Sequence, residues 1–183
     1  MNYLNPILVL VVAFVSVFLE AWVDIFRELL GTQLTLLPAL IVYVSLTHSM
    51  IVTGVLAVCG GLWFDSLSCN PLGITILPLF LVGFFIQTYR ELLLRDNLFA
   101  QSVLGLSACV LCPLGTLFLL LNFGNTPRLG WESIWQFVVM GVGGAVLTPL
   151  FFILFDYIDN TFNYQPVSQS SFRADREIKY NHR

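Results

Sequence analysis

Side chains that could carry out chemistry are few in this sequence and lie far apart. Cys109 and Cys112 are separated by two residues, a spacing that puts two thiols on one face of a helix. No histidine or acidic residue nearby completes a metal shell, so the pair is interpreted as small packing residues. His48 has no neighbouring nucleophile or metal ligand and is interpreted as a hydrogen-bonded turn residue.

The carboxylates near the later apolar segments are Asp65, Asp156 and Asp159. A membrane glycosyl or phosphoryl transferase needs clustered carboxylates to hold a metal and phosphate. In a six-helix topology Asp65 lies on the outer side, whereas the other two lie on the cytoplasmic side. We therefore expect no enzymatic activity, no metal and no cofactor. The net charge of −3 also argues against nucleic-acid binding.

The composition indicates an integral membrane protein. Of 183 residues, 57% are hydrophobic and 10% are charged. Soluble domains average about 45–50% apolar and roughly 25% charged residues, so this chain cannot coat a water-soluble surface. The expected fold is all-α, a polytopic bundle over residues 1–160, followed by a disordered cytoplasmic tail over 161–183.

Five long apolar stretches predict the membrane helices. One of them, Leu34–Phe64, has 31 residues and would be about 46 Å long as one helix, against a hydrocarbon core of about 30 Å. A polar cluster, Thr47–Ser49, lies near its middle and predicts a break into two short helices. The six expected helices are Tyr3–Trp22, two within Leu34–Phe64, Ile74–Tyr89, Leu98–Leu121 and Ser133–Tyr157.

Other segments are expected to connect or end these helices. Glu20–Gly31 is interpreted as a helix end or an interfacial helix, and Asp65–Gly73 as a polar turn. Pro78 is expected to kink the fourth helix. The polar tail begins at Asn160 in this prediction.

The distribution of the eight lysines and arginines indicates the orientation. Six helices place six of these residues on one side and two, Arg27 and Arg128, on the other. The positive-inside rule then puts both termini in the cytoplasm. Five helices give seven against one, with the N-terminus outside, so charge does not distinguish the two topologies. Helix length favours six, and the C-terminus is cytoplasmic in both.

Small residues four positions apart predict close contacts between helices, because they let helix backbones approach in a membrane. The pairs are Ala57 with Gly61, Gly105 with Cys109 and Gly141 with Ala145. Packing within the bundle is the favoured interpretation, and a groove for a partner is the alternative.

The most informative segment runs from Gly60 to Gly73 and includes Asp65, Asn70 and Pro71. A carboxylate at the membrane boundary is costly unless it is hydrogen-bonded or solvated. Asp65 is expected to accept hydrogen bonds from turn amides at Leu67 or Ser68. Contact with a partner or ligand is the alternative.

At these residues the chain resembles the rod shape-determining protein MreD family of bacterial inner-membrane proteins. The family has a G-x-x-x-D-x-x-x-x-x-P-L-G-like segment, which falls here on Gly61, Asp65 and Pro71-Leu72-Gly73. Pro149-Leu150, followed by an apolar run to Asp156, is also similar. Cys69 stands where many relatives have glycine. The similarity of layout extends over about residues 1–160.

The resemblance implies a non-enzymatic scaffold of the cell-elongation machinery that makes peptidoglycan. It implies MreC as a partner, together with the MreB filament and RodA with its transpeptidase partner, in a bacterial inner membrane with its lipids. The family fold resembles the six-helix capture subunits of energy-coupling-factor transporters. A vitamin or metabolite capture subunit is therefore the alternative function, although no small-molecule substrate is expected of a scaffold.

Overall fold

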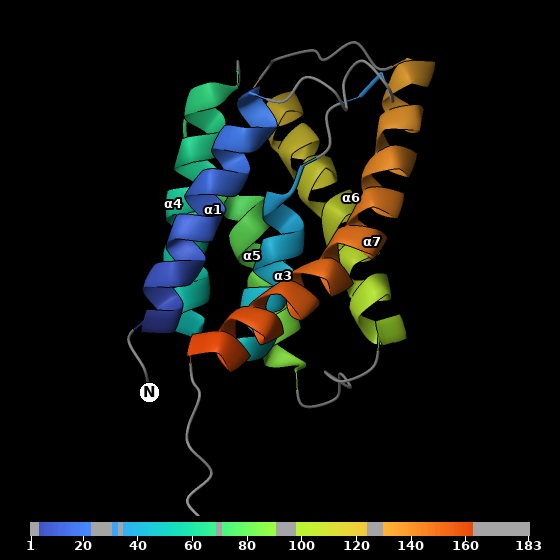
Figure 1. The fold of residues 1–183 in the computed structure, drawn as a ribbon. Helices are drawn as coiled ribbons and strands as arrows, with labels where there is room; N and C mark the ends of the chain where they lie inside the picture. The colour runs from blue at the N-terminus through green and yellow to red at the C-terminus, as the bar shows by residue number, and fades with distance from the viewer. Residues whose placement is uncertain are drawn as a thin grey trace, which may run out of the picture.

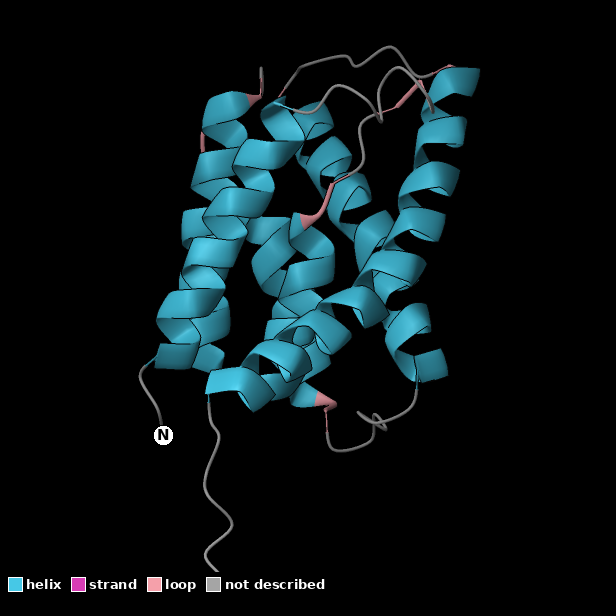
Figure 2. Cartoon of the chain, viewed as in Figure 1, coloured by secondary structure: helices cyan, strands magenta, loops and turns pink. Residues whose placement is uncertain are grey.

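The structure is a computed structural model that describes residues 4–22, 31–32, 35–68, 71–90, 98–123 and 130–162. The described residues form six α-helices and no strand (Figures 1 and 2). The helices are α1 (Leu4–Trp22), α3 (Leu37–Thr47), α4 (Met50–Leu67), α5 (Ile76–Thr88), α6 (Leu98–Asn122) and α7 (Trp131–Phe162). Predictions for Asn70, the 91–97 loop, the segment around Arg128 and the tail from 163 lie outside the described residues.

Successive helices run in opposite directions, so the bundle has two distinct ends (Figure 1). The His48 end contains the start of α1, the α3–α4 joint, the end of α5 and the end of α7. The Asp65 end contains the end of α4, the start of α5, the end of α6 and the start of α7. This alternation agrees with the predicted order of six helices.

Helix α3 is the centre of the bundle. It packs against α1, α4, α5, α6 and α7, and every residue from Leu37 to Leu46 is buried. A helix that is apolar on all sides has no face to turn towards solvent, which explains its central position. With 11 residues it is only about 16 Å long, so it fills one half of the bundle, the half nearer the His48 end.

The predicted break at Thr47–Ser49 is confirmed. His48 and Ser49 both have extended backbones, with φ/ψ of −111°/−179° and −79°/160°. The side-chain amide of Gln87 on α5 donates a hydrogen bond to the His48 carbonyl oxygen at 3.0 Å. The backbone group left without a helical partner is therefore satisfied from a neighbouring helix.

Two prolines act differently from one another. Pro78 is the third residue of α5, in the first turn, where backbone nitrogens have no carbonyl partner within the helix. A proline there breaks no helical hydrogen bond, so the predicted kink is wrong. Pro149 lies inside α7 and cannot donate to the carbonyl of Ala145. Figure 1 shows α7 bending part-way along its length. Helix α7 also continues past Asn160, where the tail was predicted to begin.

Three helices are long and apolar enough to cross a membrane: Met50–Leu67, Leu98–Asn122 and Ser133–Ile158. Three shorter apolar helices accompany them: Ile7–Glu20, Leu37–Thr47 and Ile76–Thr88. Large apolar side chains such as Phe18, Phe85 and Val146 are more than half exposed on the outside of the bundle. An apolar exterior of this kind is typical of a surface that contacts lipid.

Candidate functional site

Asp65 joins the end of α4 to the start of α5. It lies inside the last turn of α4 rather than in the predicted turn, and is 1% exposed. Its Oδ2 accepts hydrogen bonds from the backbone N–H groups of Gly73 at 2.9 Å and Thr75 at 3.1 Å. Its Oδ1 accepts a hydrogen bond from the Thr75 hydroxyl. The sequence predicted donors at Leu67 or Ser68, and that prediction is wrong. The carboxylate instead lies at the amino end of α5, where the helix dipole favours negative charge.

Gly61 and Gly73 shape this α4–α5 joint. A Cβ atom added to Gly61 would lie 3.1 Å from the Cα of Ile76 and 2.9 Å from its Cγ1, so only glycine lets α5 start this close to α4. Gly73 has φ +91°, a conformation that other residues rarely adopt. The Pro71 carbonyl accepts a hydrogen bond from the Ile74 N–H at 3.3 Å. The described residues of the G-x-x-x-D-x-x-x-x-x-P-L-G-like segment therefore form one structural unit, whereas the similar residues from Pro149 to Asp156 lie on α7.

Alanine at Gly73 is expected to destabilise the fold by about 1 kcal/mol or more, because its φ lies in the region that costs residues with a Cβ about 1–2 kcal/mol. Thermal unfolding in detergent measures the effect. Gly130→Ala is the matched control, since a Cβ there meets nothing within 4 Å and the backbone has ordinary φ. Equal unfolding temperatures for the two variants would contradict the prediction.

The predicted small-residue contacts lie between helices of this chain. Gly60 faces Leu37 of α3, with 2.8 Å between an added Cβ and the leucine Cδ1. Gly141 faces Val110 of α6 at 3.1 Å. The closest approach is between Gly105 and Gly144, where an added Cβ would overlap the other helix's backbone carbonyl. These glycine faces are occupied by neighbouring helices.

Two of the three carboxylates near the later apolar segments, Asp65 and Asp156, lie at opposite ends of the bundle. Asp156, on the last turns of α7, is exposed at the His48 end, whereas Asp65 is buried at the other end. Among the described residues, no group of three or more His, Cys, Asp or Glu could hold a metal ion. The Asp159 side chain lies outside the described residues.

The remaining candidates for chemistry take structural positions. Cys109 and Cys112 are both buried, and Cys109 packs against Gly144. The His48 Nδ1 lies 2.7 Å from the Thr47 hydroxyl, so His48 is the hydrogen-bonded turn residue that the sequence predicted. Trp63 packs edge-on against Phe14 of α1, with 5.2 Å between ring centroids.

Glu20 has a position that the sequence did not reveal. It lies in the last turn of α1, which agrees with the helix-end alternative, and it accepts a hydrogen bond from the Leu36 N–H through Oε2 at 3.3 Å. Residues 23–30 of the predicted segment lie outside the described residues. Leu36 is the residue that precedes α3, so the carboxylate caps the amino end of the central helix. Oε1 is buried and has no hydrogen-bond partner among the described residues.

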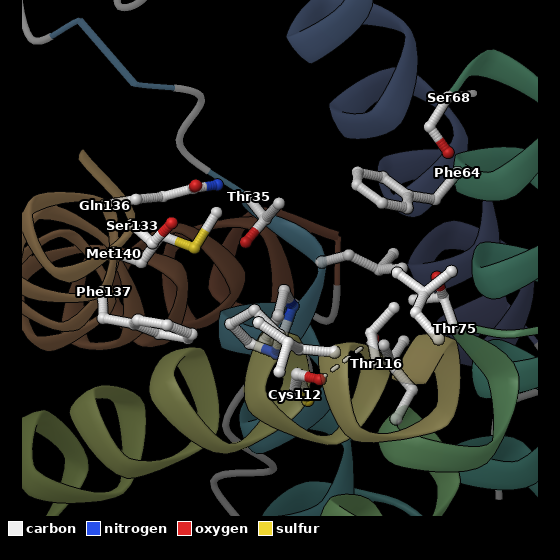
Figure 3. Close-up of a pocket in the computed structure, with 16 residues that line it drawn as sticks. Thr35, Phe64, Ser68, Thr75, Cys112, Thr116, Ser133, Gln136, Phe137 and Met140 are labelled. Carbon is white, nitrogen blue, oxygen red and sulfur yellow. Dashed lines mark hydrogen bonds between the residues drawn. The ribbon is translucent and has the colours of Figure 1, made fainter. Parts of the chain in front are cut away.

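A cavity of about 440 Å³ lies at the Asp65 end, beyond the amino end of α3. Its walls come from α3, α4, α5, α6 and α7 (Figure 3). Of the sixteen lining residues that the structure describes, ten are apolar or cysteine, and none is charged. The six polar ones are Thr35, Ser68, Thr75, Thr116, Ser133 and Gln136.

This cavity was not predicted from the sequence, although one feature of the sequence pointed to it. A break at Thr47–Ser49 leaves the first of the two short helices at about half the thickness of a bilayer. A central helix of that length cannot fill both halves of a bundle whose outer helices are longer. The space left over at one end is the cavity.

Comparison of the chain with models of protein families, with curated proteins and with solved structures finds no match. The resemblance to the MreD family therefore rests on the residues of the α4–α5 joint and on the layout of the helices.

Proposed function

We propose that this chain is a non-enzymatic membrane scaffold of the bacterial cell-elongation machinery, similar to MreD. The observation that carries the proposal is the α4–α5 joint. Gly61, Asp65 and Gly73, which carry the resemblance, depend on one another through a close approach, a set of hydrogen bonds and a positive φ. Residues linked in this way form one structural unit. A match to the family's segment at all of them therefore supports the resemblance more strongly than a match at unconnected positions.

In this proposal all six helices cross the inner membrane, and the His48 end is cytoplasmic. The basic residues Arg90, Arg95, Arg173, Arg176, Lys179 and Arg183 belong to this side by the order of the helices. The short helices α3 and α5 cross as parts of the bundle, because neighbouring helices shield their ends from lipid.

The partner in this proposal is the single membrane helix of MreC, held against the outside of the bundle. The glycine faces are already filled by α3, α5, α6 and α7, so a partner helix would use the exposed apolar exterior instead. Holding that helix would position the outer-face complex, including RodA and its transpeptidase partner, relative to the MreB filament.

Photo-crosslinking around the bundle tests this function. A photoreactive residue is placed singly at lipid-facing positions on four helices, Phe18, Phe85, Leu111 and Val146, which are 56%, 58%, 53% and 62% exposed. Crosslinks to a single-span partner of the elongation machinery are expected from one face of the bundle only. Leu40, which is 0% exposed, is the internal control and should give none.

Purification in mild detergent gives the second readout for the same cells. Co-purification of MreC is expected. Absence of MreC from both the crosslinked and the co-purified proteins would overturn the scaffold function.

A second candidate function, the capture subunit of a vitamin or metabolite transporter, is favoured by the cavity at the Asp65 end. With the His48 end in the cytoplasm, this cavity faces the outside, where a capture subunit collects its substrate. Recovery of a transducing subunit with a pair of ATPases, in place of MreC, would favour this function.

A further inference from the structure

The lining of the cavity limits what it can hold. None of its sixteen described lining residues carries a charge, so these walls offer no counter-charge to a charged ligand. Burying an unpaired charge costs far more than burying an apolar group. The described walls therefore favour an uncharged group over a charged one.

The amino end of α3, which forms the floor, does not offer an anion site either. The Leu36 N–H donates to the Glu20 carboxylate, and Pro38 has no N–H. Two of the backbone groups that would recognise a phosphate or carboxylate at a helix start are therefore not available. This floor favours an apolar contact with Leu37 and Pro38.

The polar side chains of the cavity differ in how many hydrogen bonds they can still form with a ligand. The Thr75 hydroxyl donates to Asp65, and the Thr116 hydroxyl donates to the Cys112 carbonyl at 3.0 Å. Gln136 is half-buried on α7 and extends towards Thr35 (Figure 3). No hydrogen bond joins its amide to another described residue, so it can donate to and accept from a ligand.

Water alone is a poor occupant of such a space. About 440 Å³ is within the range of roughly 300–1,000 Å³ that small-molecule sites occupy, and its walls are mainly apolar. Ordered buried water needs two to four polar partners per molecule. Three of the six polar side chains, Ser68, Thr75 and Thr116, already donate within the chain, so few partners remain to order water in a space of this size.

We propose that this cavity is a binding site for one uncharged amphiphile, with its apolar body against α3 and α6 and its hydrogen-bonding end at Gln136 of α7. Two sources supply this chemistry: an outer-leaflet lipid, whose acyl chain and ester carbonyl enter the cavity, and a neutral amphiphile dissolved outside the cell. The inference deepens the second candidate function by naming its ligand class. The scaffold function does not depend on it.

Native mass spectrometry of the full chain, released from detergent, tests the inference. The wild-type protein is expected to retain a bound molecule with a mass above that of the detergent. Thr116→Phe projects a ring into the cavity from α6 and should reduce the retained fraction at least tenfold. Thr88→Phe is the matched control, because Thr88 makes the same bond to the fourth preceding carbonyl but is exposed on α5.

Two arms separate the sources of the ligand. Solvent extraction and identification of the retained molecule show whether it is a lipid or a soluble amphiphile. Transfer of the stripped protein into vesicles of phosphatidylethanolamine and phosphatidylglycerol shows whether lipid alone restores the bound species. If Thr116→Phe does not fold, Ser133→Trp fills the cavity from α7.

A wild-type protein without any retained molecule, both as purified and after the vesicle step, would overturn the inference. Equal retention by wild type and a folded cavity-filling variant would also overturn it. Neither result would affect co-purification of MreC, so failure of the cavity and failure of the scaffold are distinguishable.

Discussion

Replacement of Asp65 by alanine is expected to lower the free energy of unfolding by about 3 kcal/mol or more. The substitution removes the acceptor for the Gly73 and Thr75 N–H groups and for the Thr75 hydroxyl. Hydrogen bonds to a charged group contribute roughly 1.5–3 kcal/mol each, and buried donors left without a partner add their desolvation cost. Unfolding of the purified protein in a mixed detergent and denaturant series measures the loss.

Asp156→Ala is the matched control for this experiment. It removes a carboxylate of the same kind from an exposed position on α7 and should leave the free energy of unfolding nearly unchanged. Asp65→Asn is expected to fall between wild type and Asp65→Ala. The amide oxygen can still accept from the Gly73 and Thr75 N–H groups, whereas the amide NH2 replaces the acceptor of the Thr75 hydroxyl and the negative charge is lost. An Asp65→Ala variant as stable as Asp156→Ala would show that the joint does not hold α4 to α5.

Replacement of Gly105 by alanine is expected to destabilise the α6–α7 pair by about 1–3 kcal/mol, the usual cost of overpacking. The added Cβ would overlap both the Thr148 hydroxyl and the backbone carbonyl oxygen of Gly144. A backbone group cannot rotate away as a flexible side chain can, so the two helices must separate. Thermal unfolding, followed by tryptophan fluorescence in detergent, measures the change.

Gly54→Ala separates this effect from intrinsic helix propensity. Both substitutions exchange glycine for alanine inside a helix, which by itself favours the helix by roughly 1 kcal/mol. At Gly54 the new Cβ meets only the Phe80 ring at 3.6 Å, an ordinary contact, so this variant should be as stable as wild type or more stable. If both variants gain stability, the close approach of Gly105 and Gly144 is not a feature of the folded protein.

The α6–α7 contact also shows which helix contacts the pattern of small residues could predict. The sequence indicated that Gly105 and Gly141 mark helix contacts, and both lie between helices. It did not indicate that Gly105 would meet Gly144, because several small residues follow one another on α7. Which of them faces α6 depends on the rotation of the helix, and the spacing of residues on one helix does not fix that rotation.

The sequence by itself determined the all-helical fold with helices apolar enough to cross a membrane, the order of six helices and the break at Thr47–Ser49. These properties are local: hydropathy adds up along a segment, and a polar cluster interrupts it wherever the segment lies. The tertiary structure alone decided the hydrogen-bond partners of Asp65, the inward position of Glu20 and the cavity at the Asp65 end. Each of these depends on how deep one helix lies in the bundle relative to its neighbours, which the sequence of a single segment does not contain. Helix α3 is short and is packed against five other helices, and the cavity lies beyond its amino end.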